Sequence, residues 1–202
     1  RLPLDFLGGM GYAVDFLTTF AIDSHRDKAI ALARSIERFG DHKDKLIYYA
    51  DAPLLQEFPQ TQWLPATDLV ALTEFQARYC HSNLANGILA KYTSQLKQDL
   101  YFYKLDAIRF SYKAMAIANY LLSDASHGGC WWIDIDISFQ ACYGEVLGAI
   151  EKECRQRIGF FDRLGPDATR CCESGLMYFP SGSAATLFGN RLQNYYVNGS
   201  LF

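Results

Sequence analysis

The sequence predicts an α/β fold built around a parallel sheet, and three observations carry that prediction. Residues 12–22 and residues 45–50 are short runs rich in aromatic and β-branched side chains, as strands are. Between them, residues 23–40 repeat apolar side chains at helical spacing. A strand, a helix and a strand in this order are typical of a βαβ unit, whose two strands are parallel.

Each further element has its own signal along the chain. The helix over residues 23–40 can be capped by Asp23 or Ser24 and is ended by Gly40. Pro53, Pro59 and Pro65 predict an irregular stretch after the second strand. The later predicted elements, in order, are a mostly helical region over residues 68–100, a long helix over 105–122, a buried strand over 128–139, a helix over 143–154, strands over 157–162 and 175–180, and a last helix over 183–196.

Composition limits the classes of protein that the sequence can be. The chain has 202 residues, half of them apolar, and a net charge of -3, which suits one domain spanning residues 1–202. Its Lys and Arg residues are scattered among Asp and Glu, so we expect neither a nucleic-acid nor a membrane partner. No apolar run approaches the ~20 residues of a transmembrane segment. Because the chain starts at Arg1 and closes with "NGSLF", we expect a processed fragment that can lack a C-terminal tail.

The cysteines and glycines suggest no special chemistry. Six cysteines without a Cys-x-x-Cys pair, in a chain with a real core, favour reduced thiols and a cytoplasmic protein. The neighbours Cys171 and Cys172 leave a vicinal disulfide open as an alternative. The four histidines have no metal-ligand spacing. The glycines of residues 7–11 precede the first strand, whereas a phosphate-binding loop follows one, so we interpret them as a flexible entry.

The stretch "GGCWWIDIDISF", residues 128–139, combines an apolar strand with two acids. Alternation along a strand places Asp134 and Asp136 on one face with Trp132, and Ile133, Ile135, Ile137 and Phe139 on the face that belongs in a core. The strand rise separates the two acids by ~6.6 Å. Two unpaired carboxylates this close repel each other and resist burial, so a positive group must lie beside them.

A divalent cation is the simplest partner for these two acids. Parallel sheets bind ligands at the carboxyl ends of their strands. Hard carboxylate oxygens suit Mg2+ or Mn2+, which keep open positions for phosphate oxygens. The alternative is a structural network in which arginines and backbone amides neutralise both acids.

The helix predicted before this strand supplies cations. Advancing ~100° per residue from Leu105 gives an inward stripe: Leu105, Ile108, Tyr112, Met115, Ala116 and Asn119. Arg109 falls inside that stripe near its edge, and Lys113 lies one step further out. Like charges four residues apart disfavour a helix, so a nearby anion would explain the pair, although a solvated Lys113 stays open. Lys104 projects from the opposite margin and is a weaker candidate.

An Asp-x-Asp that ends an apolar strand resembles the DXD motif of nucleotide-sugar-dependent glycosyltransferases of the GT-A fold. Four further stretches resemble segments of these enzymes in order and spacing: "TTFAI" (18–22), "IRFSYKAMAI" (108–117), "CYGEVLGAI" (142–150) and "CCESGLMYFP" (171–180). The matches together span most of the chain. The resemblance implies an α/β fold of GT-A type, with a mostly parallel mixed sheet flanked by helices.

The resemblance also implies an activity, which is transfer of a sugar from a nucleotide-sugar donor, such as a UDP-sugar, to a glycan acceptor in polysaccharide biosynthesis. Asp134 and Asp136 would hold Mn2+ or Mg2+ against the diphosphate. Arg109, Lys113, Ser174 and Gly175 would contact substrate or orient Asp134, and Glu173 would be the catalytic residue on the acceptor side. Phe20, Ala21 and Ile22 would pack against the base of the nucleotide.

Alternatives to this interpretation stay open. Glu173 could instead pair with an arginine such as Arg170. Many of these transferases have a third metal ligand near the C-terminus, often His, whereas no His follows His127 here. Haloacid-dehalogenase-like phosphatases also carry Asp-x-Asp after an apolar strand, but near the start of the chain. A module that binds sugar nucleotide without turnover is the non-enzymatic alternative.

Overall fold

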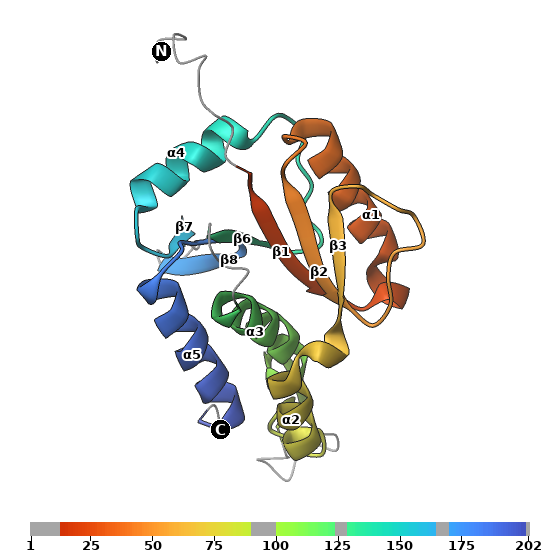
Figure 1. Cartoon of the computed structure of the whole chain (residues 1–202). Helices are drawn as coiled ribbons and strands as arrows, with labels where there is room; N and C mark the ends of the chain where they lie inside the picture. The colour runs from red at the N-terminus through yellow and green to blue at the C-terminus, as the bar shows by residue number, and fades with distance from the viewer. Residues whose placement is uncertain (1–12, 90–99, 124–128, 165–169, 201–202) are drawn as a thin grey trace.

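The computed structural model describes residues 13–89, 100–123, 129–164 and 170–200, and the side chains of residues 89, 100–105, 162–164 and 170–173 lie outside that description (Figure 1). A six-stranded sheet forms its centre. Its strands, from one edge to the other, are β3 (Thr61–Pro65), β2 (Lys45–Ala50), β1 (Asp15–Phe20), β6 (Cys130–Ile133), β8 (Arg170–Phe179) and β7 (Gly159–Leu164).

The sheet is mostly parallel and mixed. β1 pairs in parallel with β2 on one side and with β6 on the other, and β3 extends the parallel part beyond β2. β8 runs antiparallel to both β6 and β7. The predicted βαβ unit is confirmed as β1, α1 (Ile22–Phe39) and β2. The carboxyl ends of β1, β2, β3 and β6 therefore lie along one edge of the sheet.

Helices cover both faces of this sheet (Figure 1). α1 and α4 (Gly144–Cys154) contribute to the hydrophobic cluster on one face. α2 (Val70–Tyr79), α3 (Ala107–Leu122) and α5 (Ser183–Val197) contribute to the cluster on the other face. Trp131 points into the first cluster and Trp132 into the second, and each is 2% exposed. β6 is therefore buried on both sides, as its continuous apolar sequence requires.

Two predicted regions differ from the structure. The helical prediction for residues 68–100 is right for α2 but wrong at β4 (Asn86–Leu89), which pairs antiparallel with β5 (Leu100–Asp106), and residues 90–99 lie outside the described part. The long helix starts at Ala107 instead of residue 105, because the Asp106 carboxylate caps it by accepting the Arg109 N–H at 2.8 Å. The stretch predicted to be irregular contains a strand, β3. Pro65 is tolerated there because it is the last residue of an edge strand.

The ends of α1 show one wrong prediction and one confirmed prediction. Neither Asp23 nor Ser24 caps the helix; the N-cap is Ala21, and the Asp51 carboxylate accepts the Ile22 N–H at 2.8 Å. Gly40 ends the helix as predicted, with its N–H on the Ile36 carbonyl, and a Cβ there would collide with the Tyr143 hydroxyl. The glycines of residues 7–11 lie outside the described residues.

The remaining elements agree with the sequence. α4, β7 and α5 lie within two residues of the predicted bounds, whereas β8 starts at Arg170, five residues before the predicted strand. Cys80, Cys130, Cys142 and Cys154 carry free thiols, whereas the side chains of Cys171 and Cys172 lie outside the described part. In the portion of the chain that the structure describes, no helix is long and apolar enough to cross a membrane.

Candidate functional site

The two acids directly follow β6, at the edge where the parallel strands end. β6 stops at Ile133, and the Asp134 N–H makes the last bond to β8, donating to the Gly175 carbonyl at 2.7 Å. The Ile137 N–H then donates to the Asp134 carbonyl at 3.0 Å, which closes a turn. The predicted strand through residue 139, with both acids on one strand face, is therefore wrong, because the backbone turns as soon as pairing with β8 ends.

The apolar half of the motif lies where the sequence placed it. Ile135, Ile137 and Phe139 pack against the cluster that contains Trp131 and Ile133. The Phe139 ring lies 5.4 Å from Phe16 and 4.0 Å from Tyr143, measured between ring centroids. This packing anchors the turn and leaves its two acids on the outside.

Asp134 is held by two side-chain donors. Lys113 Nζ lies 2.9 Å from Asp134 Oδ1, and Trp132 Nε1 donates to the same oxygen at 2.6 Å. Within the described structure, Asp134 Oδ2 has no hydrogen-bond partner. The Asp134 side chain is 38% exposed, so that oxygen is accessible to a ligand.

The cation beside Asp134 is Lys113, whereas the predicted inward stripe of the helix had favoured Arg109. Arg109, Tyr112 and Asn119 are exposed, so the predicted inward stripe is wrong at these three positions. α3 is enclosed by the sheet, α2 and α5, and it buries residues such as Ser111, Ala114 and Ile117 that one stripe would leave outside. From its half-buried position, Lys113 also donates to the Ser174 carbonyl.

Asp136 differs from Asp134 in its surroundings. It is exposed, and it makes neither a hydrogen bond nor an ion pair with any described residue. Asp134 Oδ2 and the Asp136 carboxylate are hard oxygen donors, which fit an ion such as Mg2+ or Mn2+ that binds through one or two carboxylates plus phosphate and water. Among the described residues there is no group of three or more His, Cys, Asp or Glu side chains that could hold a metal. Asp134 and Asp136 are thus two candidate ligands, and metal binding by them stays a prediction.

The structure brings β8 to this site through its backbone. Ser174 and Gly175 supply the carbonyls bonded by Lys113 and Asp134. The backbone of Glu173 is paired with Phe161 of β7, and its side chain lies outside the described part. Four predicted site residues, Lys113, Asp134, Ser174 and Gly175, therefore form one bonded cluster.

The predicted base-contacting residues lie at the end of β1, on the strand next to β6. Phe20 is 9% exposed and stacks on Tyr48, with 5.3 Å between ring centroids. Ile22 is buried as well, whereas Ala21 is exposed. Contact of these residues with a base stays a prediction, and Ala21 is the one of the three that offers open surface to a ligand.

Two residues of this edge did not enter the sequence prediction as site residues. Trp132 bonds Asp134 through its indole N–H, and alternation had placed both on one face without indicating a bond. Asp51 follows β2 and bonds the first turn of α1. An acid directly after a parallel strand is the signal that could have identified it.

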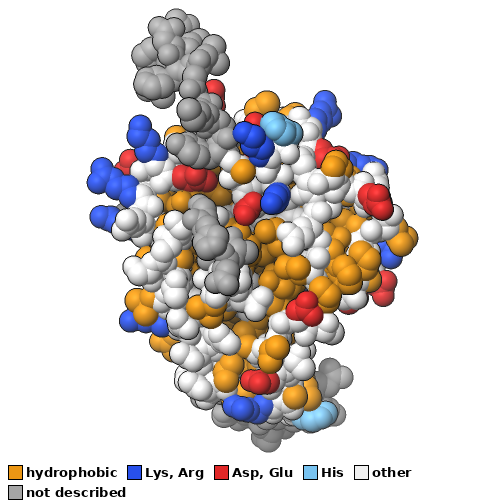
Figure 2. Space-filling view, viewed as in Figure 1, with side chains coloured by type: hydrophobic (Ala, Val, Ile, Leu, Met, Phe, Trp, Pro, Cys, Tyr) orange, Lys and Arg blue, Asp and Glu red, His pale blue; other side chains and the backbone are white. Residues whose placement is uncertain are grey.

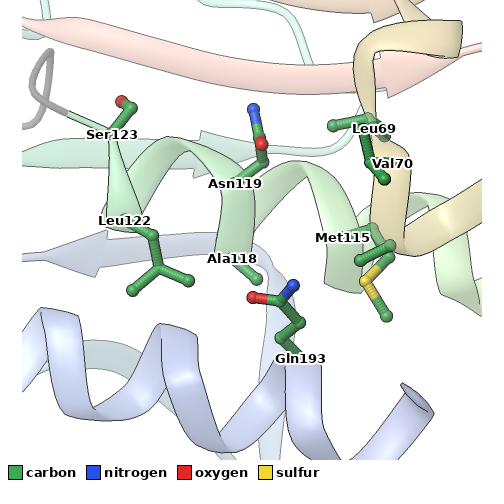
Figure 3. A pocket seen from close by; sticks show the side chains of 9 residues that line it. Leu69, Val70, Met115, Ala118, Asn119, Leu122, Ser123 and Gln193 are labelled. Carbon is green, nitrogen blue, oxygen red and sulfur yellow. The ribbon is translucent and has the colours of Figure 1, made fainter.

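A separate pocket of about 220 Å³ lies between α2, α3 and α5 (Figure 3). Leu69, Val70, Met115, Ala118 and Leu122 give it a largely apolar wall, and Asn119, Ser123 and Gln193 add polar groups. It shares no residue with the Asp134 cluster. On the face shown in Figure 2, Lys and Arg side chains are interspersed with Asp and Glu around a more apolar middle.

Among solved structures, the chain is similar to the crystal structure of mouse Xyloside xylosyltransferase 1 in its apo form. The TM-score is 0.54 and the sequence identity is 12%, and the match covers 93% of this chain and 74% of that chain. At this identity the likeness shows the fold alone, and it confirms the predicted α/β fold of GT-A type. No family model and no curated protein matches the sequence.

Proposed function

We propose that this protein is a metal-dependent glycosyltransferase that moves a sugar from a nucleotide-diphosphate sugar, such as a UDP-sugar, to a hydroxyl of a glycan acceptor. The observation that carries the proposal is the pair Asp134 and Asp136 in the turn that follows β6, with one oxygen of Asp134 unpaired among the described residues and Asp136 exposed. The fold shared with a xylosyltransferase supports it.

Each residue of the site has a role in this proposal. Asp134 and Asp136 hold Mn2+ or Mg2+, which supplies Lewis-acid stabilisation of the departing diphosphate. Lys113 places a positive charge beside the same phosphates. Ala21, at the adjacent end of β1, contacts the nucleotide, and Glu173 is the proposed catalytic residue on the acceptor side.

A thermal-shift experiment tests this function. UDP and UDP-sugars should raise the melting temperature when Mn2+ is present and much less without it, because a ligand that binds only the folded state stabilises it by mass action. Asp136→Ala should abolish the Mn2+-dependent part of the shift and leave the melting temperature of the unliganded protein nearly unchanged. Asp27→Ala, which replaces an exposed acid on α1, is the matched control and should respond as the wild type does.

Other outcomes separate the alternatives. Hydrolysis of a simple aryl phosphate without any nucleotide would favour a phosphatase. A Mn2+-dependent shift with neither transfer nor hydrolysis across an acceptor panel would favour a binding module. The proposal fails if no nucleoside diphosphate or nucleotide sugar shifts the melting temperature of the wild type with Mn2+.

A further inference from the structure

The ammonium group of Lys113 is the most heavily engaged charge of the site. It bonds Asp134 Oδ1 at 2.9 Å and the Ser174 carbonyl, and it lies 4.9 Å from the centroid of the Trp132 ring. The side chain is 22% exposed, so water screens this charge less than it screens a surface lysine. Lys113 therefore joins α3 to the end of β6 and to the middle of β8.

The contacts of Lys113 divide the two oxygens of Asp134 into different roles. Oδ1 accepts from Lys113 and from Trp132, which occupies both of its lone pairs. Oδ2 has no partner within the described residues. The Asp134 backbone is fixed as well, through the Gly175 carbonyl and the Ile137 N–H. The carboxylate is thus held so that a cation can reach it through Oδ2.

The charge balance follows from the same contacts. Lys113 neutralises Asp134, so that the two side chains and Asp136 together carry a single negative charge. A doubly charged cation is bound weakly by such a site on its own. When a diphosphate binds beside these residues, it adds negative charge and further oxygen ligands, so the site then binds the cation more tightly.

We propose that Lys113 is a positioning residue that makes cation binding conditional on the diphosphate of the donor, by occupying Asp134 Oδ1 and cancelling the charge of Asp134. This inference rests on the proposed function and deepens it, because it names the residue that couples the two ligands. Linkage requires the coupling to be reciprocal, so Mn2+ raises the affinity for the diphosphate by the same factor as the diphosphate raises that for Mn2+.

Binding measurements on the whole chain test the coupling without any turnover. The probes are Mn2+ alone, UDP alone and the two together, followed by calorimetry and by the electron paramagnetic resonance signal of free Mn2+. In the wild type, UDP should tighten Mn2+ binding by about tenfold or more, within the usual range of coupling between two ligands. Lys113→Met keeps the aliphatic stem and removes the charge, so Mn2+ alone should bind several-fold tighter and the effect of UDP should shrink.

Two variants serve as controls, and a third is a substitute for the test variant. Lys113→Arg keeps the charge and should restore most of the coupling. Lys28→Met removes an exposed lysine of α1 and should behave as the wild type. Lys113→Gln takes the place of Lys113→Met if the latter does not fold.

The inference is overturned if Lys113→Met, or Lys113→Gln in its place, leaves both the Mn2+ affinity and its dependence on UDP at the wild-type values. It is equally overturned if the variant weakens Mn2+ binding to the same degree with and without UDP. A wild type that binds no Mn2+ with UDP or any other nucleoside diphosphate would overturn the proposed function itself. The two failures are therefore distinguishable.

Discussion

An aspartate lies next to β1 at the amino ends of the parallel strands (the amino edge), and another lies next to it at their carboxyl ends (the carboxyl edge). The surroundings of these two carboxylates differ. At the amino edge, Asp44 precedes β2 and is 2% exposed. Its Oδ1 accepts the Val14 N–H at 2.9 Å, and its Oδ2 accepts the Asp41 N–H at 2.9 Å and the Tyr143 hydroxyl at 2.8 Å. At the carboxyl edge, Asp134 is half-buried, with both of its donors on a single oxygen.

The difference distinguishes an acid that holds the fold together from one that keeps capacity for a ligand. Asp44 has donors on both oxygens, and none of them is a cation, so its hydrogen bonds tie the entries of β1 and β2 to the start of α4. Asp134 is paired with Lys113 and retains an oxygen without a partner in the described structure. A carboxylate with unused acceptor capacity next to an exposed second carboxylate is what a cation site needs.

Alanine at each edge gives the largest expected contrast. Asp44→Ala removes the acceptor of three hydrogen bonds, two of them buried and one half-buried, and should lower the free energy of unfolding by about 4 kcal/mol. For a chain of this size that corresponds to a fall of about 10 °C in melting temperature. Asp136→Ala should change the free energy of unfolding by less than about 0.5 kcal/mol, as exposed substitutions do. Urea unfolding followed by circular dichroism measures both.

Equal losses at the two positions would contradict the comparison, since they would make Asp136 a structural residue. Asp27→Ala on α1 serves as the exposed reference for both variants. A stable Asp44→Ala protein would show that the three hydrogen bonds contribute little to folding.

Tyr143 supplies one of the three hydrogen bonds to Asp44 at the amino edge. Its hydroxyl donates to Asp44, and burial, followed by that hydrogen bond, raises the pKa of Tyr143. Tyr143→Phe should lower the free energy of unfolding by about 2 kcal/mol at pH 7, because a bond to a charged acceptor is lost. A phenol whose pKa is raised on folding stabilises the fold fully below pH ~10, the unfolded value, and this contribution is lost as the pH rises toward the folded value.

The gap in stability between the wild type and Tyr143→Phe should therefore shrink above pH 10, by about 1 kcal/mol between pH 9 and pH 11. Denaturant unfolding at a series of pH values measures the gap, which should stay constant from pH 7 to pH 9. A gap that widens above pH 10 would mean that the folded state favours the ionised phenol. The other buried tyrosines are common to both proteins and cancel in the difference.

The sequence predicted those parts of the molecule that depend on local pattern. β1, α1, β2 and α4 follow from runs and periodicity within single segments. The prediction that a positive group lies beside the two acids is right for Asp134, which pairs with Lys113, whereas Asp136 is exposed and has no partner among the described residues. Metal binding by the two acids stays a prediction. These inferences need no knowledge of which segments meet.

The parts that depend on contacts between segments were not predictable. Lys113, not Arg109, bonds Asp134, because α3 starts at Ala107 and is enclosed on several sides, so its orientation is set by packing. The stop of β6 at Ile133 depends on where β8 ceases to pair with it. The pairing of β4 with β5 overrode a helical pattern, since tertiary pairing outweighs local propensity.

Thr18 lies in the middle of β1, between the amino and carboxyl ends of the strands. Unlike Asp44, it is a buried polar group without a hydrogen-bond partner among the described residues, so it allows the converse test. Its hydroxyl oxygen is fully buried and, within the described structure, has no hydrogen-bond partner. Burying a hydroxyl that has no hydrogen-bond partner destabilises the folded state. Removing this hydroxyl should therefore stabilise the protein, whereas removing a hydrogen-bonded hydroxyl should not. Thr18→Val should therefore raise the free energy of unfolding by about 1 kcal/mol, the lower end of the desolvation penalty of an unpaired group.

Thr19, the next residue, is the matched control, because its hydroxyl donates to the Tyr49 carbonyl at 2.9 Å. Thr19→Val should lower the free energy of unfolding by about 1 kcal/mol, so that one substitution at adjacent positions of one strand has opposite signs. Both variants exchange a β-branched side chain for another, which keeps strand propensity and shape nearly constant. Destabilisation of both would mean that the Thr18 hydroxyl finds a hydrogen-bond partner in solution. Thr18 would then be a satisfied buried polar group, as Asp44 is.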